Sequence, residues 1–214
     1  MNNSTRWPCY SGMPALSDSY VRLLHASPDT PPVDIYADGN MIMGNLAFEQ
    51  ITEYVPVNPG EYRIQVYPAG QTDNPLIDTI FTVPPERSYT LALVGRMDDV
   101  GLLPIPEAYL PMVDRRSTYV RFVHLAPGAP EVDITLPDGT RVFRGVGYRQ
   151  HSNYIPLNPG SYTLVVRVAN GNGMPLLTIP NVRFSPGVVY SVYAVGLPEG
   201  EPRLGALVAT DGEY

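Results

Sequence analysis

The chain contains 214 residues, a length that accommodates two domains of about 100 residues each. Apolar residues make up 44% of the chain and the formal net charge is -7, so buried cores are expected and a basic nucleic-acid-binding surface is not. The sequence has no lysine and one cysteine, which excludes Schiff-base and P-loop chemistry, an intrachain disulfide and a cysteine-based metal site.

Residues 1–18 are predicted to form an arm ahead of the first domain. They lack the apolar segment of a secretory signal peptide, and no part of the chain approaches the roughly 18 apolar residues of a membrane helix. We therefore expect a soluble chain that is neither exported by the usual route nor inserted in a membrane. Within the arm, Trp7, Cys9 and Tyr10 predict contact with a neighbouring subunit, through strand addition to a sheet edge or a disulfide at Cys9. A frayed terminus is the alternative.

Turn residues and alternating apolar residues then predict short β-strands. Pro28–Pro32 is too rich in proline for a strand ladder and is expected to cross the surface in an extended conformation. Asp38-Gly39 favours a tight hairpin turn with positive φ, and Asn58–Gly60 fits a type II turn. In Glu61–Tyr67, apolar and polar residues alternate with the period of a half-buried strand.

The same pattern returns about one domain length later, which indicates an internal repeat. A repeat of this length corresponds to whole domains and not to a solenoid. We predict a first domain at 19–109, a linker at 110–117 and a second domain at 118–214. The matching segments are Tyr20–His25 with Tyr119–His124, Pro31–Ile35 with Pro130–Ile134, Tyr54–Gly60 with Tyr154–Gly160, and Tyr89–Gly95 with Tyr190–Gly196.

Each repeat is predicted to contain seven or eight strands, with the last strands in Val100–Ile105 and Arg203–Ala209. Turns follow one another at the spacing of a β-sandwich, and no window has a convincing helical period. The predicted fold class is all-β, with two tandem immunoglobulin-like or transthyretin-like β-sandwich domains.

A histidine and an aspartate recur at equivalent positions of the two repeats: His25 with His124, and Asp34 with Asp133. An imidazole and a carboxylate are found together in metal sites and in acid–base catalysis. One of each per domain falls short of the three or four ligands that a metal needs. We favour a structural role, in which the buried histidine is held by a carboxylate or a backbone carbonyl. Metal binding and catalysis are the alternatives.

An arginine also recurs, as Arg22 and Arg121, in strands that are otherwise apolar. A buried arginine requires a carboxylate partner, and Asp34 and Asp133 are the natural candidates within each domain. We predict a structural ion pair in each repeat, and a clamp for a ligand carboxylate is the alternative. The sequence contains no serine- or cysteine-nucleophile motif and no phosphate-binding glycine motif. No catalytic, cofactor-binding or metal-ligating residue is therefore assigned.

Tyrosine is unusually frequent, with 15 residues. Tyr36, Tyr67, Tyr148 and Tyr193 are not obviously core residues. Exposed tyrosines suit contacts with proteins and sugars because they combine apolar area with a hydroxyl group. The alternative explanation is the ordinary preference of tyrosine for strands.

The repeated motifs resemble the family known as domain of unknown function 4397. The resemblance implies a bacterial protein of tandem β-domains, often secreted or attached to the cell envelope, and in spore formers sometimes on the spore surface. It implies no catalytic activity and supplies no site residue. A spore layer made in the mother cell would explain the lack of a signal peptide, and a cytoplasmic location is the alternative. The motifs that carry the resemblance lie at Val21–Asp29, Val33–Gly39 and Tyr54–Gly70.

The sequence thus predicts a non-enzymatic structural or adhesion module of a bacterial cell or spore surface, self-assembling through its N-terminal arm. The alternative is a carbohydrate- or peptide-binding module that uses exposed tyrosines. A third reading is an enzyme with an unfamiliar site at the domain junction. The expected partners are further copies of the chain or other surface proteins, with polysaccharide as a further candidate and with neither nucleic acid nor a cofactor.

Overall fold

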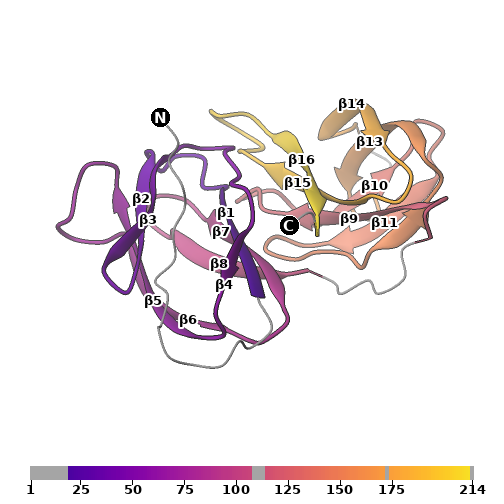
Figure 1. The fold of residues 1–214 in the computed structure, drawn as a ribbon. Helices are drawn as coiled ribbons and strands as arrows, with labels where there is room; N and C mark the ends of the chain where they lie inside the picture. The colour runs from indigo at the N-terminus through magenta and orange to yellow at the C-terminus, as the bar shows by residue number, and fades with distance from the viewer. Residues whose placement is uncertain (1–18, 108–113, 172–173, 213–214) are drawn as a thin grey trace. The chain divides into compact units, whose positions relative to one another are not determined.

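The computed structural model describes residues 19–107, 114–171 and 174–212. All the regular elements of these residues are β-strands, and they form two compact units (Figure 1). We call residues 19–107 unit 1 and residues 114–171 and 174–212 unit 2. The predicted contact residues of the arm, Trp7, Cys9 and Tyr10, lie outside the described residues.

Unit 1 consists of two four-stranded sheets with the orders β4-β1-β7-β8 and β3-β2-β5-β6. All neighbouring strands are antiparallel except β1 and β7, which are parallel. The strands are β1 (Ser19–His25), β2 (Val33–Ala37), β3 (Asn40–Leu46), β4 (Val55–Val57), β5 (Gly60–Pro68), β6 (Ile77–Val83), β7 (Ser88–Val94) and β8 (Gly101–Pro106).

Unit 2 repeats this arrangement, with sheets β12-β9-β15-β16 and β11-β10-β13-β14 and a parallel pair formed by β9 and β15. The predicted β-sandwich fold is thus confirmed for both repeats. The strands are β9 (Thr118–His124), β10 (Val132–Thr135), β11 (Arg141–Val146), β12 (Ile155–Leu157), β13 (Gly160–Val168), β14 (Leu177–Phe184), β15 (Val189–Val195) and β16 (Gly205–Asp211).

The strand order distinguishes between the two predicted types of sandwich. If the strands of unit 1 are lettered A to H in chain order, the sheets read DAGH and CBEF. An immunoglobulin constant-type domain has the sheets ABED and CFG, so that its first strand lies beside the second. Here the first strand lies between the fourth and the seventh, which is the transthyretin-like alternative.

The core of each unit lies between its two sheets, because alternate residues of each strand point inward. In unit 1 the buried cluster includes Val21 of β1 and Leu91 of β7 from one sheet, and Ile35 of β2 and Ile64 of β5 from the other. In unit 2 the corresponding cluster is centred on aromatic and branched residues of all the central strands. Each unit therefore closes its own apolar interior.

The turns agree with the sequence in one place and differ in another. Asp38 and Gly39 have φ angles of 48° and 76° and join β2 to β3, which is the predicted hairpin turn with positive φ. The predicted type II turn at Asn58–Gly60 is wrong, since Gly60 has a φ of 158° and not the approximately 80° of such a turn. The reason is topological, because this segment joins β4 and β5, which belong to different sheets.

Candidate functional site

A buried arginine lies on the outward side of sheet β4-β1-β7-β8. Val21 and Leu23 of β1 point into the core, so Arg22 points to the opposite face of the sheet. Arg22 Nε donates to Thr90 Oγ1 at 2.9 Å, and Arg22 Nη2 lies 3.4 Å from Glu107 Oε1. The Thr90 hydroxyl donates to the same carboxylate oxygen at 2.9 Å. Two opposite charges, each only 4% exposed, are thus paired directly and through a shared hydroxyl.

Unit 2 builds the same arrangement from different residue types. Arg121 Nε donates to Ser191 Oγ at 2.6 Å and lies 3.7 Å from Asp211 Oδ2. The Ser191 hydroxyl donates to the Asp211 carboxylate, and the Tyr154 hydroxyl donates to the same oxygen at 2.6 Å. A serine and a shorter acid therefore take the places of the threonine and glutamate of unit 1.

A tyrosine ring covers each of these guanidinium groups. Arg22 Cζ lies 4.5 Å from the centroid of the Tyr54 ring, and Arg121 Cζ lies 4.7 Å from that of Tyr154, which are cation–π distances. We call the two groups the arginine clusters. They consist of Arg22, Tyr54, Thr90 and Glu107 in unit 1, and of Arg121, Tyr154, Ser191 and Asp211 in unit 2.

The predicted ion pairs between Arg22 and Asp34 and between Arg121 and Asp133 are wrong. The strands β1 and β2 belong to opposing sheets, and so do β9 and β10. Because the arginine and the aspartate both point away from the core, they lie on opposite outer sides of the sandwich. The arginines pair with carboxylates at the end of the last strand instead, and Asp133 lies 3.6 Å from Arg141.

The recurring aspartate holds a distorted strand in place. Asp34 Oδ1 accepts a hydrogen bond from the backbone N–H of Asn45, and Oδ2 accepts one from that of Gly70, both at 2.8 Å. Asn45 has a φ of 55° and lies where the register between β2 and β3 shifts, so the carboxylate satisfies a β-bulge and the turn after β5. The equivalent contacts of unit 2 join Asp133 to Gly145 at 2.9 Å and to Asn170 at 3.3 Å.

The recurring histidine ties the end of the first strand to the crossing that follows. His25 Nε2 lies 3.2 Å from the Pro31 carbonyl oxygen, and His124 Nε2 lies 3.1 Å from that of Pro130. Because a carbonyl only accepts, Nε2 carries the proton, and His124 Nδ1 in turn accepts from the Ala126 N–H at 3.3 Å. Desolvation by burial lowers the pKa of both imidazoles, and the carbonyl hydrogen bonds oppose part of that shift. The geometry is that of two neutral histidines in structural roles.

Two of the singled-out tyrosines meet on the outward face of sheet β3-β2-β5-β6. The rings of Tyr36 and Tyr67 lie 5.5 Å apart in an edge-to-face arrangement, and both are partly exposed. Tyr36 is directly opposite Gln65 on β5, and Gln65 donates to Asp78, which also accepts two hydrogen bonds from Arg63. This places an aromatic pair beside a polar row, which we call the tyrosine face.

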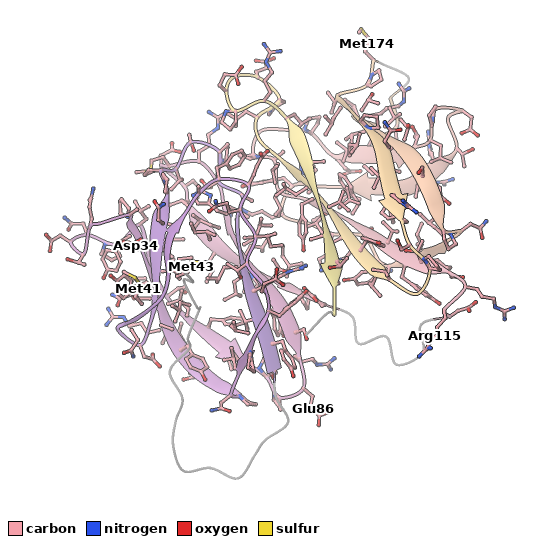
Figure 2. All side chains as sticks on the ribbon, turned by 45° about the horizontal axis from the view of Figure 1, so that its top comes forward. Asp34, Met41, Met43, Glu86, Arg115 and Met174 are labelled. Atoms are coloured by element: carbon pink, nitrogen blue, oxygen red, sulfur yellow. The ribbon has the colours of Figure 1, made fainter. Side chains whose placement is uncertain are left out.

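The rest of the tyrosine face is formed by β3. Met41 is opposite Tyr36 and is half exposed, and a Cβ atom placed on Gly44 would lie 3.4 Å from Met41 Sδ and 3.5 Å from Asp34 Oδ1. Figure 2 shows Asp34 and Met41 on this part of unit 1, and Met43, which packs against the core, on the same strand as Met41. The face therefore combines aromatic rings, the thioether group of Met41 and a polar row.

The corresponding face of unit 2 has a different chemistry. The strand registers place Thr135, Arg141, Val165 and Arg167 where unit 1 has Tyr36, Met41, Gln65 and Tyr67. The difference extends to whole-unit charge, since residues 19–107 contain 12 carboxylate side chains and 4 arginines, whereas residues 114–212 contain 7 and 9. The repeat thus preserves the hydrogen-bonding roles of the buried polar residues and changes the exposed residues of this face.

The other two tyrosines, Tyr148 and Tyr193, do not form an exposed surface for ligand contact. Tyr193 is fully buried, so the expectation that it lies outside the packed interior is wrong. It points to the outward side of β15, since Val192 and Ala194 point into the core, and that side is buried as well. The Tyr148 ring packs against His124 at 6.2 Å and under the guanidinium of Arg149 at 5.2 Å.

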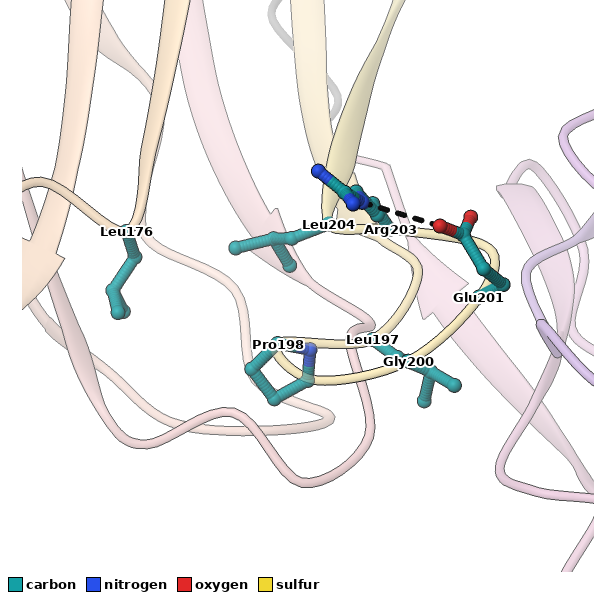
Figure 3. A pocket seen from close by; sticks show the side chains of 7 residues that line it. All are labelled: Leu176, Leu197, Pro198, Gly200, Glu201, Arg203 and Leu204. Carbon is teal, nitrogen blue, oxygen red and sulfur yellow. Dashed lines mark hydrogen bonds and ion pairs between the residues drawn. The ribbon is translucent and has the colours of Figure 1, made fainter.

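A hollow of about 450 Å³ lies at one end of unit 2 (Figure 3). Leu176, Leu197, Pro198 and Leu204 supply apolar walls, and the ion pair of Glu201 and Arg203, 3.1 Å apart, lies at its rim. The volume is within the range of small-molecule pockets, but both charged side chains of the lining are largely exposed. The lining therefore lacks the buried polar group that would orient a ligand.

Within the described ranges, no three histidine, cysteine, aspartate or glutamate side chains are grouped closely enough to hold a metal ion. The same part of the chain contains no helix with the length and apolarity needed to cross a membrane. The polar groups that recur in both repeats are engaged with one another and with the backbone, as described above.

Sequence reasoning missed the carboxylates of the arginine clusters, Glu107 and Asp211. The two acids differ in type and fall after the last matched segment, so the repeat gave no signal for them. Tyr54 and Tyr154 were detectable, because both begin the repeated segment that ends in Asn-Pro-Gly. Their position over an arginine follows from the short strands β4 and β12, which pair with β1 and β9.

Comparison with solved structures gives distant similarities. The C-terminal domain of AlgF from P. aeruginosa is 20% identical with a TM-score of 0.34, over 44% of this chain and 98% of that one. CBMbc (family CBM26) from Eubacterium rectale Amy13K, solved with maltoheptaose, is 12% identical with a TM-score of 0.28, over 91% and 97%. A putative cell adhesion protein from Bacteroides fragilis is 8% identical with a TM-score of 0.22, over 92% and 99%. With TM-scores this low, no functional inference is drawn from these similarities.

A search of the curated proteins finds no match to the chain. The family model does match, and it does so twice, over residues 19–135 and 118–213, in agreement with the two units of the fold. The chain belongs to the family described as Domain of unknown function (DUF4397).

Proposed function

We propose that this protein is a non-enzymatic structural or adhesion module of a bacterial cell or spore surface. The observation that carries the proposal is that the polar residues recurring in both units make hydrogen bonds within the fold. Arg22, His25 and Asp34 each bind to another strand or loop of unit 1, and their counterparts in unit 2 do the same. A scaffold of this kind leaves the exposed sheet faces and edges as the parts available for contact.

The arrangement of charge supports a role in binding and not in catalysis. A catalytic acid or base requires a side chain that can reach a substrate in a cleft. The carboxylates of the arginine clusters are buried and already accept hydrogen bonds from hydroxyl groups. The histidines bind backbone carbonyls, with pKa values lowered by burial. The hydrogen bonds of these carboxylates and histidines therefore serve the structure of each unit.

The proposal includes self-assembly through the N-terminal arm, with Trp7, Cys9 and Tyr10 as the contact residues. The test is the mass of the full chain in solution, by light scattering, with and without reductant. We expect species well above the 23.5 kDa of one copy, and a loss of the largest species on reduction or in Cys9→Ser. A truncated chain that lacks residues 1–18 and assembles like the full one would show that the arm is not involved.

A second candidate function is binding of carbohydrate or peptide at the tyrosine face. The observation that favours it is the edge-to-face pair of Tyr36 and Tyr67 beside Gln65 and Asp78. Aromatic rings next to hydrogen-bonding side chains suit the apolar faces and hydroxyl groups of sugars. Retention of the protein on polysaccharide columns, and its loss in a Tyr36→Ala, Tyr67→Ala double variant, is the expected result. Equal retention of both proteins would exclude the tyrosine face.

A further inference from the structure

The edges of the four sheets differ in how they are protected against pairing with another chain. Unprotected edge strands invite pairing, and proline, bulges and shortness prevent it. The short strands β4 and β12 contain Pro56 and Pro156, and β8 contains Pro104. The strands β3 and β11 are each interrupted by two register shifts. Of the eight edge strands in the described part of the chain, β6 and β16 alone have neither a proline nor a bulge.

The strand β6 and its counterpart β14 differ in how regularly they pair with the neighbouring strand. In β14, Pro180 and Asn181, which has a φ of 57°, coincide with a register shift against β13. A proline removes a backbone donor and a bulge twists the edge, so the edge of β14 is protected against pairing with another strand. In β6 all seven residues pair regularly with β5. No strand of the described residues pairs with the other side of β6, so the N–H and C=O groups there form a continuous row.

The strand β6 also exposes more of its side chains than β16 does. Ile80, at the centre of β6, is 67% exposed, and Asp78, Thr79 and Thr82 are exposed as well. In β16 only Val208 is exposed, at 42%, and the other six residues are buried or half-buried. The edge of β6 is therefore the most accessible regular edge of the described residues.

We propose that β6 pairs in antiparallel orientation with β6 of a second copy of the chain, with the two Ile80 residues directly opposite each other. Ile80 is the central residue of the seven, so in this register Ile77 falls opposite Val83, Asp78 opposite Thr82, and Thr79 opposite Phe81. Such an isologous pairing joins the sheets of two copies across a two-fold axis.

The side chains favour this register. On the outward face, Ile80 covers Ile80 of the second copy, so the most exposed large hydrophobic residue of the unit is removed from water. Each Asp78 faces the hydroxyl of Thr82, and the two Asp78 carboxylates are four positions apart, so like charges are not opposed. Each Asp78 is already neutralised by Arg63 of its own copy. One-residue slips would place Ile80 against the inward-facing row and lose these pairs.

The pairing deepens the proposed self-association by naming one contacting surface, separate from the N-terminal arm. A seven-residue edge buries less than the roughly 1,200 Å² of a standard stable interface. The dimer is therefore expected to be reversible and concentration-dependent, and to be strengthened where copies are crowded on a surface.

Crosslinking tests the register directly. In a full-length Cys9→Ser background, Ile80→Cys places the two introduced thiols opposite each other, with Cβ atoms about 5 Å apart. Thr82→Cys is the matched control on the same face of the same strand, where the two thiols would be about 13 Å apart along the strands. Under mild oxidation we expect at least tenfold more disulfide-linked dimer from Ile80→Cys. Equal crosslinking of the two variants, or none from Ile80→Cys, would overturn the proposed pairing.

Sedimentation equilibrium provides the second measurement, with circular dichroism to verify folding. Ile80→Lys is expected to weaken dimerisation at least tenfold, and Val208→Lys on the other regular edge is expected to leave it unchanged. A dimer that resists Ile80→Lys, or that Val208→Lys alone disrupts, would contradict the role of β6. If assemblies persist in Ile80→Lys but are lost when residues 1–18 are removed, the result would support the proposed self-assembly through the N-terminal arm and would contradict the β6 pairing.

Discussion

Unit 1 and unit 2 have the same strand order and equivalent buried polar groups, but the outward faces of their sheets β3-β2-β5-β6 and β11-β10-β13-β14 differ. Tyr36 and Tyr67 in unit 1 correspond to Thr135 and Arg167 in unit 2. Where the buried groups differ, the hydrogen-bonding pattern is kept, as in the replacement of Thr90 and Glu107 by Ser191 and Asp211. The exposed positions of this face show no such constraint.

This difference separates the residues that the fold requires from the residues that can vary between the two units. A buried arginine must be neutralised wherever it occurs, because an unpaired buried charge is strongly unfavourable. An exposed residue on a sheet face contributes little to folding and is free to serve a contact. Function is therefore to be sought in the positions at which the two units disagree.

The largest effect is expected from breaking an arginine cluster. Asp211→Ala leaves Arg121, which is 1% exposed, without its carboxylate, and should lower the free energy of unfolding by about 3–5 kcal/mol. Glu107→Ala should do the same in unit 1, where Arg22 loses the carboxylate of its ion pair. Denaturant unfolding measures both, and Asp114→Ala is the control, because its ion pair with Arg116 is exposed. Equal, small losses in all three variants would contradict a structural role for the clusters.

A smaller effect is expected from the aspartate that holds the bulge. Asp34→Ala leaves the N–H groups of Asn45 and Gly70 without their acceptor and should cost about 2–3 kcal/mol. Asp34→Asn keeps one acceptor oxygen and should lose less. Hydrogen exchange should localise the loosening to β3 and the turn after β5. Faster exchange throughout unit 1, with no local pattern, would assign the aspartate a different role.

The histidines predict a pH dependence with a definite sign. Burial lowers the folded-state pKa of His25 and His124 below the ordinary value of 6.5, so the unfolded chain binds more protons. Stability from these groups is fully present above pH 6.5 and is lost as the pH falls toward the folded pKa. A His25→Gln, His124→Gln variant should have a flatter dependence of unfolding free energy between pH 7 and 5. An unchanged slope would mean that other groups cause it.

The smallest effect on stability is expected at the tyrosine face. Replacing Tyr36 and Tyr67 with their unit 2 counterparts, as Tyr36→Thr and Tyr67→Arg, removes an aromatic pair and should cost only about 0.5–1.5 kcal/mol. If the face binds sugar or peptide, the same change should abolish retention on the matching column. Loss of folding in this variant would show that the tyrosines belong to the scaffold of unit 1.

Much of the fold was predictable because the repeat and the alternation of apolar residues report directly on strands. The eight strands of each unit, the Asp38-Gly39 turn and the positions of the last strands follow from local sequence. Strand order does not, since it depends on which strands meet across long separations. That is why Arg22 and Asp34, only 12 positions apart, were paired in the prediction although their strands belong to different sheets.

The candidate site was less predictable than the fold. The recurrence of Arg22, His25 and Asp34 marked them as important, but the partners that explain them are an acid next to the last strand, a backbone carbonyl and backbone N–H groups. Backbone partners have no side-chain identity to find in a sequence. The tyrosine face required the register of β2 against β5, which brings Tyr36 and Tyr67 together.

The acid of each arginine cluster comes from the far end of its unit, and this has a consequence for biosynthesis. Arg22 and Arg121 are made early, whereas Glu107 and Asp211 leave the ribosome after almost all of the unit that they complete. The parallel contact of the first strand with the seventh already imposes a high contact order and slow closure. Each domain can therefore become stable only after its final residues have been synthesised. A chain that lacks the few residues at that end should remain incompletely folded and be degraded by proteases.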